Sequence, residues 1–343
     1  MTKNMNDLAL GITLQGVEPP AIFRQQVRDV AAGRFTHLWV TDSSLHARYV
    51  YAYLTLAAVE SDNIMLATGV THPYTRHPAM TANAIATLHE ISGGRAILGM
   101  GAGDRPTAEL GFQPARLADL RSSIQVIRKL LAGEKVNHHS PCFELTDGEL
   151  HFDFNERVPI FMAASGPKML ALAGEVADGV LAQVGIFPEA IKFARECVAE
   201  GAARAGRSID EIDLWLMACG SVSEDDADGL NGSRTMAAWF AKVAPHCCHI
   251  AGLDEAVVSD IQSAYRGGEF HLARDAARLV PDDMVKLFTV GGAPAQIRER
   301  LTPLLDLGIA GINFMPIGPQ RAASAARFNR EVAGPLGLGK RDG

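Results

Sequence analysis

Several features that would place this chain in a common functional class are missing from its sequence. Its 343 residues carry 32 Lys and Arg against 39 Asp and Glu, a net charge of −7, and no block rich in basic residues. Because nucleic-acid binding needs a concentrated basic face, we expect no nucleic-acid partner. No uninterrupted apolar run approaches the roughly 20 residues that span a bilayer, so we expect no membrane association.

Signals for export and for several large enzyme classes are missing as well. The five cysteines lack the spacing of a disulfide framework, which fits a reducing compartment. The first residues, MTKNMNDLALGITL, lack the apolar run and cleavage site of a signal peptide, so we expect a cytoplasmic protein. Gly-x-Ser-x-Gly, P-loop and HExxH motifs do not occur, which argues against the common hydrolase, nucleoside-triphosphatase and zincin classes.

One short cluster invites a metal interpretation. It is His246-Cys247-Cys248-His249, in which both ligand types of zinc occur. Adjacent cysteines have poor geometry for a single tetrahedral ion, and no second pair stands at ligand spacing. We therefore expect this cluster to pack rather than to bind a metal, and we expect no metal site.

The sequence does contain a regular alternation of short β-type runs and helical patterns. With 48% hydrophobic residues, the chain can bury a large core. Eight runs predict strands, at residues 8–13, 37–41, 64–70, 96–100, 158–164, 179–184, 212–219 and 311–315. Most of them precede a helical pattern, which predicts an α/β fold, one (β/α)8 TIM barrel domain over residues 1–343.

Two segments interrupt this alternation. Residues 135–154 contain Pro141 and an Asp147-Gly148 turn between β-type runs, which predicts a hairpin insertion after the fourth strand. Residues 224–287 have a helical pattern and follow the seventh strand. We expect this helical insertion to cover the barrel mouth, with Phe240, Tyr265, Phe270 and Leu272 contributing to a partly apolar pocket.

Polar residues and glycines follow several strands directly, at the rim where barrel enzymes carry their active sites. Each of them alone could be a turn or cap residue, but their common position predicts a site. In strand order they are Asp42, Gly69-Val70-Thr71-His72, Gly101-Ala102-Gly103-Asp104, Ser165-Gly166-Pro167-Lys168 and Gln183.

The residue types suggest how this rim could work. Asp42 could accept a hydrogen bond from a cofactor or substrate, or cap the next helix. Asp104 is a candidate general acid, and the glycines at 101 and 103 would let a flat ligand approach the backbone. Ser165–Lys168 could cradle a phosphate at a helix start, or form an ordinary turn with proline at the first helical position.

Three blocks of the sequence resemble the methylenetetrahydromethanopterin reductase branch of the luciferase-like superfamily. They cover residues 69–104, 158–181 and 291–316, and the likeness extends from Leu8 to Pro316. The resemblance implies a (β/α)8 barrel that binds reduced flavin or deazaflavin at the carboxyl ends of its strands. It further implies hydride transfer to or from the cofactor ring.

The resemblance also implies roles for single residues. Gly69-Val70 matches a bulge with a non-prolyl cis peptide behind the cofactor ring, and Thr71 continues this cofactor-binding segment. Asp42 matches the acidic residue near the cofactor head, Asp104 the carboxylate after the fourth strand, and Gly166-Pro167 the phosphate contacts. Gly101-Ala102-Gly103, with Ser165 and Lys168, completes the predicted cofactor site.

One departure from the family pattern leaves the cofactor open. Many deazaflavin-dependent relatives place His directly after the Asp of the second strand, whereas Ser43 follows Asp42 here. His46 could substitute for that His, so Asp42, His46 and Asp104 are the candidate catalytic residues. These residues do not identify the small-molecule substrate.

Two functions remain as alternatives. The first is an oxidoreductase that uses coenzyme F420 to reduce or oxidise a small organic substrate, with Asp104 or His46 handling the proton. The second is a two-component monooxygenase that receives FMNH2 from a separate flavin reductase. A barrel that binds flavin without turnover is disfavoured by the glycines and the phosphate cradle. Family members are commonly homodimers, so a homodimer is expected.

Overall fold

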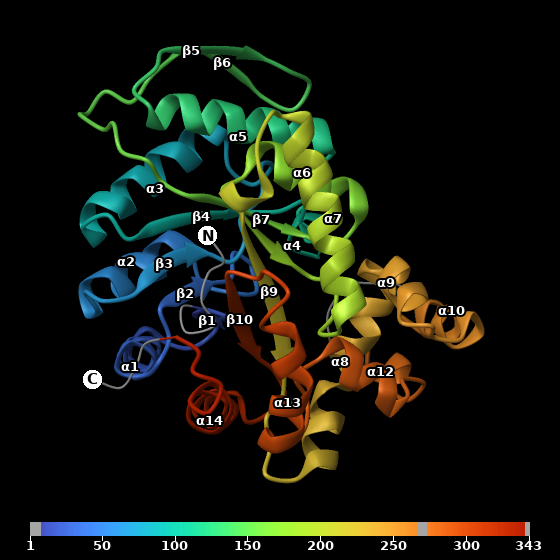
Figure 1. Cartoon of the computed structure of the whole chain (residues 1–343). Helices are drawn as coiled ribbons and strands as arrows, with labels where there is room; N and C mark the ends of the chain where they lie inside the picture. Colours follow the sequence, from blue (N-terminus) through green and yellow to red (C-terminus); the bar gives the residue numbers. More distant parts are fainter. Residues whose placement is uncertain (1–7, 104, 266–272, 340–343) are drawn as a thin grey trace.

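The structure, a computed structural model, describes residues 8–103, 105–265 and 273–339. In them, eight parallel strands close into a barrel in the order β1-β10-β9-β8-β7-β4-β3-β2, and helices surround it (Figure 1). This confirms the predicted (β/α)8 fold, whereas the extent of the domain, residues 1–343, stays a prediction. The barrel strands are β1 (Ala9–Leu14), β2 (His37–Val40), β3 (Met65–Thr68), β4 (Ala96–Met100), β7 (Ile160–Ala164), β8 (Gly179–Ala182), β9 (Asp213–Gly220) and β10 (Gly311–Pro316).

Proline begins many of the helices, because its fixed φ and missing N–H suit the first helical position. Helix α3 shows this start and also a glycine stop, since Gly93 has a φ of 66° in the left-handed region. The helices outside the insertion are α1 (Pro20–Ala32), α2 (Val50–Glu60), α3 (Pro78–Ser92), α4 (Arg105–Glu109), α5 (Leu117–Leu131), α6 (Pro167–Val176), α7 (Pro188–Arg204), α13 (Pro294–Leu301) and α14 (Arg321–Arg327). Helix α14 and the π-helical turn after it, η5 (Phe328–Ala333), were not predicted.

Large and small side chains alternate inside the barrel and fill it below the strand ends. The rings of Trp39, Phe161 and Trp215 meet at centroid distances of 5.6, 6.1 and 6.3 Å. Gly179 and Gly311 make room for them, since a Cβ there would lie 2.3 Å from Phe161 and 2.8 Å from Trp215. Open space is therefore left at the carboxyl ends of the strands.

The predicted hairpin insertion is present and lies over α5 (Figure 1). Its turn differs from the prediction, because residues 140–143 connect the strands and Asp147-Gly148 lies inside the second one. Phe143 explains the difference: its ring stacks on His138 at 4.4 Å and meets His77 at 5.4 Å. These contacts hold the turn beside the start of α3. The two antiparallel strands are β5 (Val136–His139) and β6 (Glu144–Gly148).

The segment after β9 is helical, as predicted for residues 224–287. Phe240 is fully buried against Phe288, with ring centroids 5.3 Å apart, and Tyr265 is 2% exposed. Both fill the core of the insertion, and neither lines the cavity described below. Phe270 and Leu272 lie outside the described residues. The insertion consists of α8 (Asp226–Val243), α9 (Pro245–Ile250), α10 (Glu255–Ala264), α11 (Arg274–Ala277) and α12 (Asp282–Phe288).

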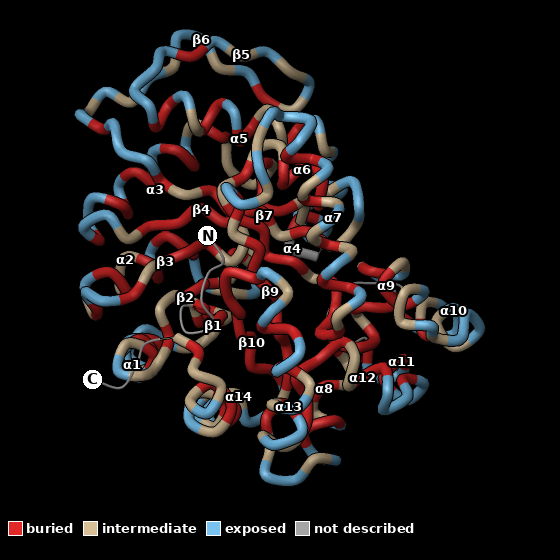
Figure 2. The backbone as a smooth tube through the Cα atoms, viewed as in Figure 1, coloured by how far each residue is buried: buried red, intermediate tan, exposed pale blue. Residues whose placement is uncertain are grey.

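Burial is concentrated in the barrel strands and the inner faces of the helices, whereas the outer helix faces and the hairpin are exposed (Figure 2). Within the residues that the structure describes, no helix combines the length and the apolar character needed to cross a membrane.

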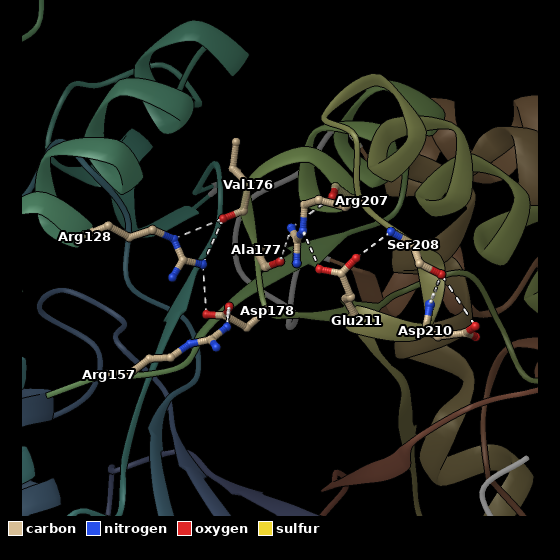
Figure 3. A network of polar contacts seen from close by, with 10 residues as sticks. Arg128, Arg157, Val176, Ala177, Asp178, Arg207, Ser208, Asp210 and Glu211 are labelled. Carbon is tan, nitrogen blue, oxygen red and sulfur yellow. Dashed lines mark hydrogen bonds and ion pairs between the residues drawn. The ribbon is translucent and has the colours of Figure 1, made fainter. Parts of the chain in front are cut away.

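A polar network ties the barrel together at the amino ends of β7 and β8 (Figure 3). Asp178 accepts hydrogen bonds from Arg128 at 2.8 Å and Arg157 at 2.6 Å, and from the backbone N–H of Ile160 at 2.8 Å. Burial alone would raise the pKa of Asp178, but the charge of Arg128 and these hydrogen bonds lower it overall. Because the network lies at the end opposite the strand carboxyl ends, its role is stability rather than chemistry.

Candidate active site

A cavity of about 360 Å³ opens at the carboxyl ends of the barrel strands. All eight strands contribute to its lining, together with α6 and α8. The lining residues are Gln15, Thr41, Asp42, Ser43, His46, Gly69, Val70, His72, Gly101, Ala102, Gly103, Ala163, Ala164, Ser165, Met169, Gln183, Met217, Cys219, Met236, Trp239, Val243 and Met315. A second cavity, of about 530 Å³, lies outside the barrel between α1 and α14 and contains no predicted site residue.

Most of the predicted site residues meet in the first cavity. They are Asp42, His46, Gly69, Val70, Gly101, Ala102, Gly103 and Ser165. Four others are described but do not line it: Thr71 is fully buried behind the wall, and Gly166, Pro167 and Lys168 lie beside it at the start of α6. Asp104 lies outside the described residues.

The Asp42 carboxylate is held by one guanidinium. Arg76 donates to both of its oxygens, Nη1 to Oδ2 and Nη2 to Oδ1, the second at 2.9 Å. The same Arg76 donates to Thr71 Oγ1 at 2.9 Å. The Asp42 and Arg76 side chains are both largely buried: Asp42 is 5% exposed and Arg76 is 12% exposed. Thr71 and Arg76 thus support Asp42 from behind.

Two tyrosines fix the guanidinium in place. The Arg76 Cζ lies 4.8 Å from the ring centre of Tyr49 and 5.3 Å from that of Tyr51, within the range of cation–π attraction. Burial lowers the pKa of Arg76, but the hydrogen bond and charge of Asp42 outweigh it, so the pKa is raised overall. Asp42 therefore presents its remaining lone pairs to the cavity as a fixed acceptor.

The ends of β3 and β4 form a wall with few side chains, which we call the glycine wall (Gly69-Val70 and Gly101–Gly103). The peptide bond between Gly69 and Val70 is cis, as the family resemblance implied. A Cβ at Gly101 would lie 2.8 Å from Val70 Cγ2, and Gly103 has a φ of 75°. The glycines are thus required by the packing of this wall itself, independently of any ligand.

The start of α6 differs from the predicted cradle in one respect. The Ser165 hydroxyl donates to the backbone oxygen of Val243 at 3.0 Å, and His246 Nε2 lies 2.8 Å from the backbone oxygen of Ser165. The helical insertion is therefore fastened to this loop. Burial lowers the pKa of His246, and its hydrogen bond to Ser165 only partly opposes this.

The cysteines near the site are poorly suited to reaction. Burial raises the pKa of Cys219, which lines the cavity, to about 12. Burial likewise raises the pKa of Cys247 to about 12 and that of Cys248 to about 11. Among the described residues, no group of three or more His, Cys, Asp or Glu side chains is placed to hold a metal ion.

Reasoning from strand ends missed several lining residues. Gln15 follows β1 in the same way as Asp42 follows β2, so the same rule could have found it. The apolar residues from α8 carry no comparable signal, because nothing in the sequence says which face of the insertion turns to the barrel. His72 was noted but given no role; it lines the cavity and is 2% exposed.

A closed parallel barrel with a cavity at the carboxyl ends of its strands is the architecture of the barrel enzymes, which carry their active sites at that face. The family model described as luciferase-like monooxygenase matches residues 5–311. The chain belongs to this family.

Two curated relatives cover most of the chain. It is 38% identical over 306 residues to the 5,10-methylenetetrahydromethanopterin reductase of Methanolobus tindarius, which covers 88% of this chain and 92% of the relative. It is 26% identical over 313 residues to the F420-dependent glucose-6-phosphate dehydrogenase of Amycolatopsis mediterranei, covering 86% and 88%.

A solved structure is similar over nearly the full length. The coenzyme F420-dependent tetrahydromethanopterin reductase of Methanopyrus kandleri superposes with a TM-score of 0.82 at 30% identity, covering 96% of this chain and 99% of that one.

Proposed function

We propose that this protein is an oxidoreductase that transfers hydride between coenzyme F420 and a small organic substrate. The observation that carries the proposal is the cavity at the strand ends, in which a fixed acceptor, Asp42, stands beside the glycine wall. The relatives named as F420-dependent enzymes, which match most of the chain, support the choice of cofactor.

The lining residues fit a deazaflavin ring. The glycine wall offers a surface without long side chains, against which a flat ring can lie. Asp42, held by Arg76, would accept a hydrogen bond from an N–H group on the polar edge of the ring. F420, when bound, would supply or receive the hydride, and the protein would orient it and exclude water.

The start of α6 would hold the cofactor phosphate. The Ser165 hydroxyl already donates to Val243, Pro167 has no N–H, and Met169 and Leu170 donate theirs to the Gly166 oxygen. The backbone N–H groups of Gly166 and Lys168 and the Lys168 ammonium would therefore make the contacts. Ser165 would then keep the insertion in place rather than bind phosphate directly.

His46 and Asp104 remain the candidates for proton transfer. His46 lines the cavity and is also exposed to solvent, so it could exchange its proton with water between turnovers. Asp42 is assigned to cofactor binding alone, because Arg76 occupies both of its oxygens.

The test is an anaerobic turnover assay with reduced F420 and a panel of ketones and enones. The proposal predicts oxidised F420 without oxygen, at a rate that rises with protein concentration. Substrate conversion that requires FMNH2, oxygen and a flavin reductase would instead identify a two-component monooxygenase.

We further propose a homodimer formed through α2 and α3, which lie side by side (Figure 1). Their outer face carries large apolar side chains: Val59 is 69% exposed, Met80 60% and Ile91 45%. A surface of this kind on adjacent helices is typical of a protein interface.

A further inference from the structure

The cavity has a second wall that differs in kind from the glycine wall. The strand order of the barrel sets β9 and β10 across from β3 and β4. Met217, three residues before the end of β9, and Met315, one residue before the end of β10, line the cavity. Methionine side chains therefore face the glycine wall across the mouth.

The helical insertion extends this second wall. Met236, Trp239 and Val243 of α8 all line the cavity, and their spacing of three and four residues places them on one helix face. Met169 of α6 lines it as well. We call this surface the methionine wall; it consists of Met169, Met217, Met236, Trp239, Val243 and Met315.

The chemistry of this wall restricts what can contact it. A charged group pressed against thioether, indole and aliphatic side chains would lose its hydration without gaining a partner. Flat, uncharged groups bury apolar area there. The flexible methionine side chain adapts to their shape, and its sulfur makes favourable contacts with unsaturated rings. Asp42, which could balance a cation, lies at the end of β2 and is occupied by Arg76.

We propose that the methionine wall selects an uncharged, largely apolar substrate with a conjugated carbonyl or carbon–carbon double bond. The inference rests on the proposed function, since the substrate would lie between this wall and the cofactor ring on the glycine wall. One hydride from reduced F420 would go to a carbon of the double bond and one proton to the other atom, leaving oxidised F420 and the saturated product. A sugar phosphate is excluded from this role.

The wall can be tested by binding alone, without turnover. Two fluorescent probes with the same rings are titrated into the whole chain, with and without F420: uncharged N-phenyl-1-naphthylamine and anionic 8-anilinonaphthalene-1-sulfonate. We expect the uncharged probe to bind at least tenfold more tightly and to be excited by energy transfer from tryptophan, in part from Trp239, which lines the cavity. Equal or tighter binding of the anionic probe in the cavity would overturn the proposal.

Variants of α8 test whether the probe binds against the methionine wall. Met236→Gln keeps the length of the side chain but makes it polar, and should weaken binding of the uncharged probe about tenfold. Trp239→Leu, at a partly exposed position, should reduce energy transfer without abolishing it, because Trp39 and Trp215 remain inside the barrel below the cavity. Ala227→Gln places the same new side chain on an exposed part of α8 and should change nothing.

The outcomes separate the two proposals. Unchanged affinity of the uncharged probe in both the Met236 and Trp239 variants, with thermal unfolding like that of the parent, would refute the methionine wall. Failure of F420 to bind while the probes behave as expected would refute the proposed function and leave the apolar site standing. In the turnover assay, 2-cyclohexen-1-one should exceed its carboxylated analogue at least tenfold in kcat/KM.

Discussion

A single arginine links two residues of the mouth that are distant in the sequence. Arg76 donates hydrogen bonds to both carboxylate oxygens of Asp42 and to the Thr71 hydroxyl. The rings of Tyr49 and Tyr51 lie against its guanidinium. Planar fork-to-carboxylate geometry is specific to arginine. The acceptor that we assign to the cofactor ring is thus positioned by a side chain that itself does not line the cavity.

This arrangement predicts the effect of a conservative change. Arg76→Lys keeps the charge but loses the bidentate contact, so F420 binding should weaken about tenfold, or roughly 1.4 kcal/mol. Fluorescence titration with F420 measures it. Arg24→Lys, in an exposed ion pair with Glu60, is the matched control and should leave the Kd unchanged. Equal affinity in both variants would show that Asp42 needs no support from Arg76.

At the scale of elements, the positions of strands and helices followed from the spacing of hydrophobic residues and from the prolines and glycines that bound the helices. Strand β4, for example, begins and ends where the sequence predicts. The hairpin turn was misplaced because Phe143 packs on His77, 66 residues earlier in the chain, and no local signal reveals such a contact. The helical character of α8 was predicted, but its cavity-facing side was not, because the sequence shows a helical pattern and does not say which face turns toward the barrel.

The network at the amino ends of β7 and β8 predicts a stability effect. Asp178 is 13% exposed and joins Arg128 and Arg157 to the strand backbone, so Asp178→Asn should lower the free energy of unfolding by about 2 kcal/mol. Urea denaturation at neutral pH measures it. Asp210→Asn, at an 85% exposed position, should stay within about 0.5 kcal/mol of the parent.

The pH dependence of this effect has a definite sign. The pKa of Asp178 is lowered in the folded state, so its contribution is fully present above the unfolded value, near 3.9. It is lost as the pH falls through the lower, folded value. The stability difference between the parent and Asp178→Asn should therefore shrink below about pH 4. A difference that stays constant there would contradict the assignment.

At the scale of the whole molecule, the eight strand ends converge on one mouth, which is why a rule about strand ends recovered much of the site. What the rule could not supply was the part of the methionine wall that α8 contributes, because those residues belong to the large insertion between β9 and β10 and do not follow a strand. The exposed apolar side chains on the outer faces of α2 and α3 concern the oligomeric state, since a monomer would leave them in contact with water.

The dimer proposal predicts that charge on this face separates the subunits. Val59→Glu with Met80→Glu should give monomers in analytical ultracentrifugation, because each glutamate would have to be buried unpaired. Leu279→Glu, at a position 45% exposed and far from α2 and α3 in the sequence, should remain dimeric. Sedimentation of the parent chain as a monomer would contradict the dimer proposal.

The central claim is that the mouth of the barrel binds coenzyme F420 for hydride transfer. Its most direct test is a side-by-side equilibrium titration of the purified chain with F420 and with FMN, each in oxidised and reduced form. The account predicts saturable binding of F420, with one site per chain, and FMN binding at least a hundredfold weaker. Tight binding of reduced FMN with no binding of F420 would contradict it.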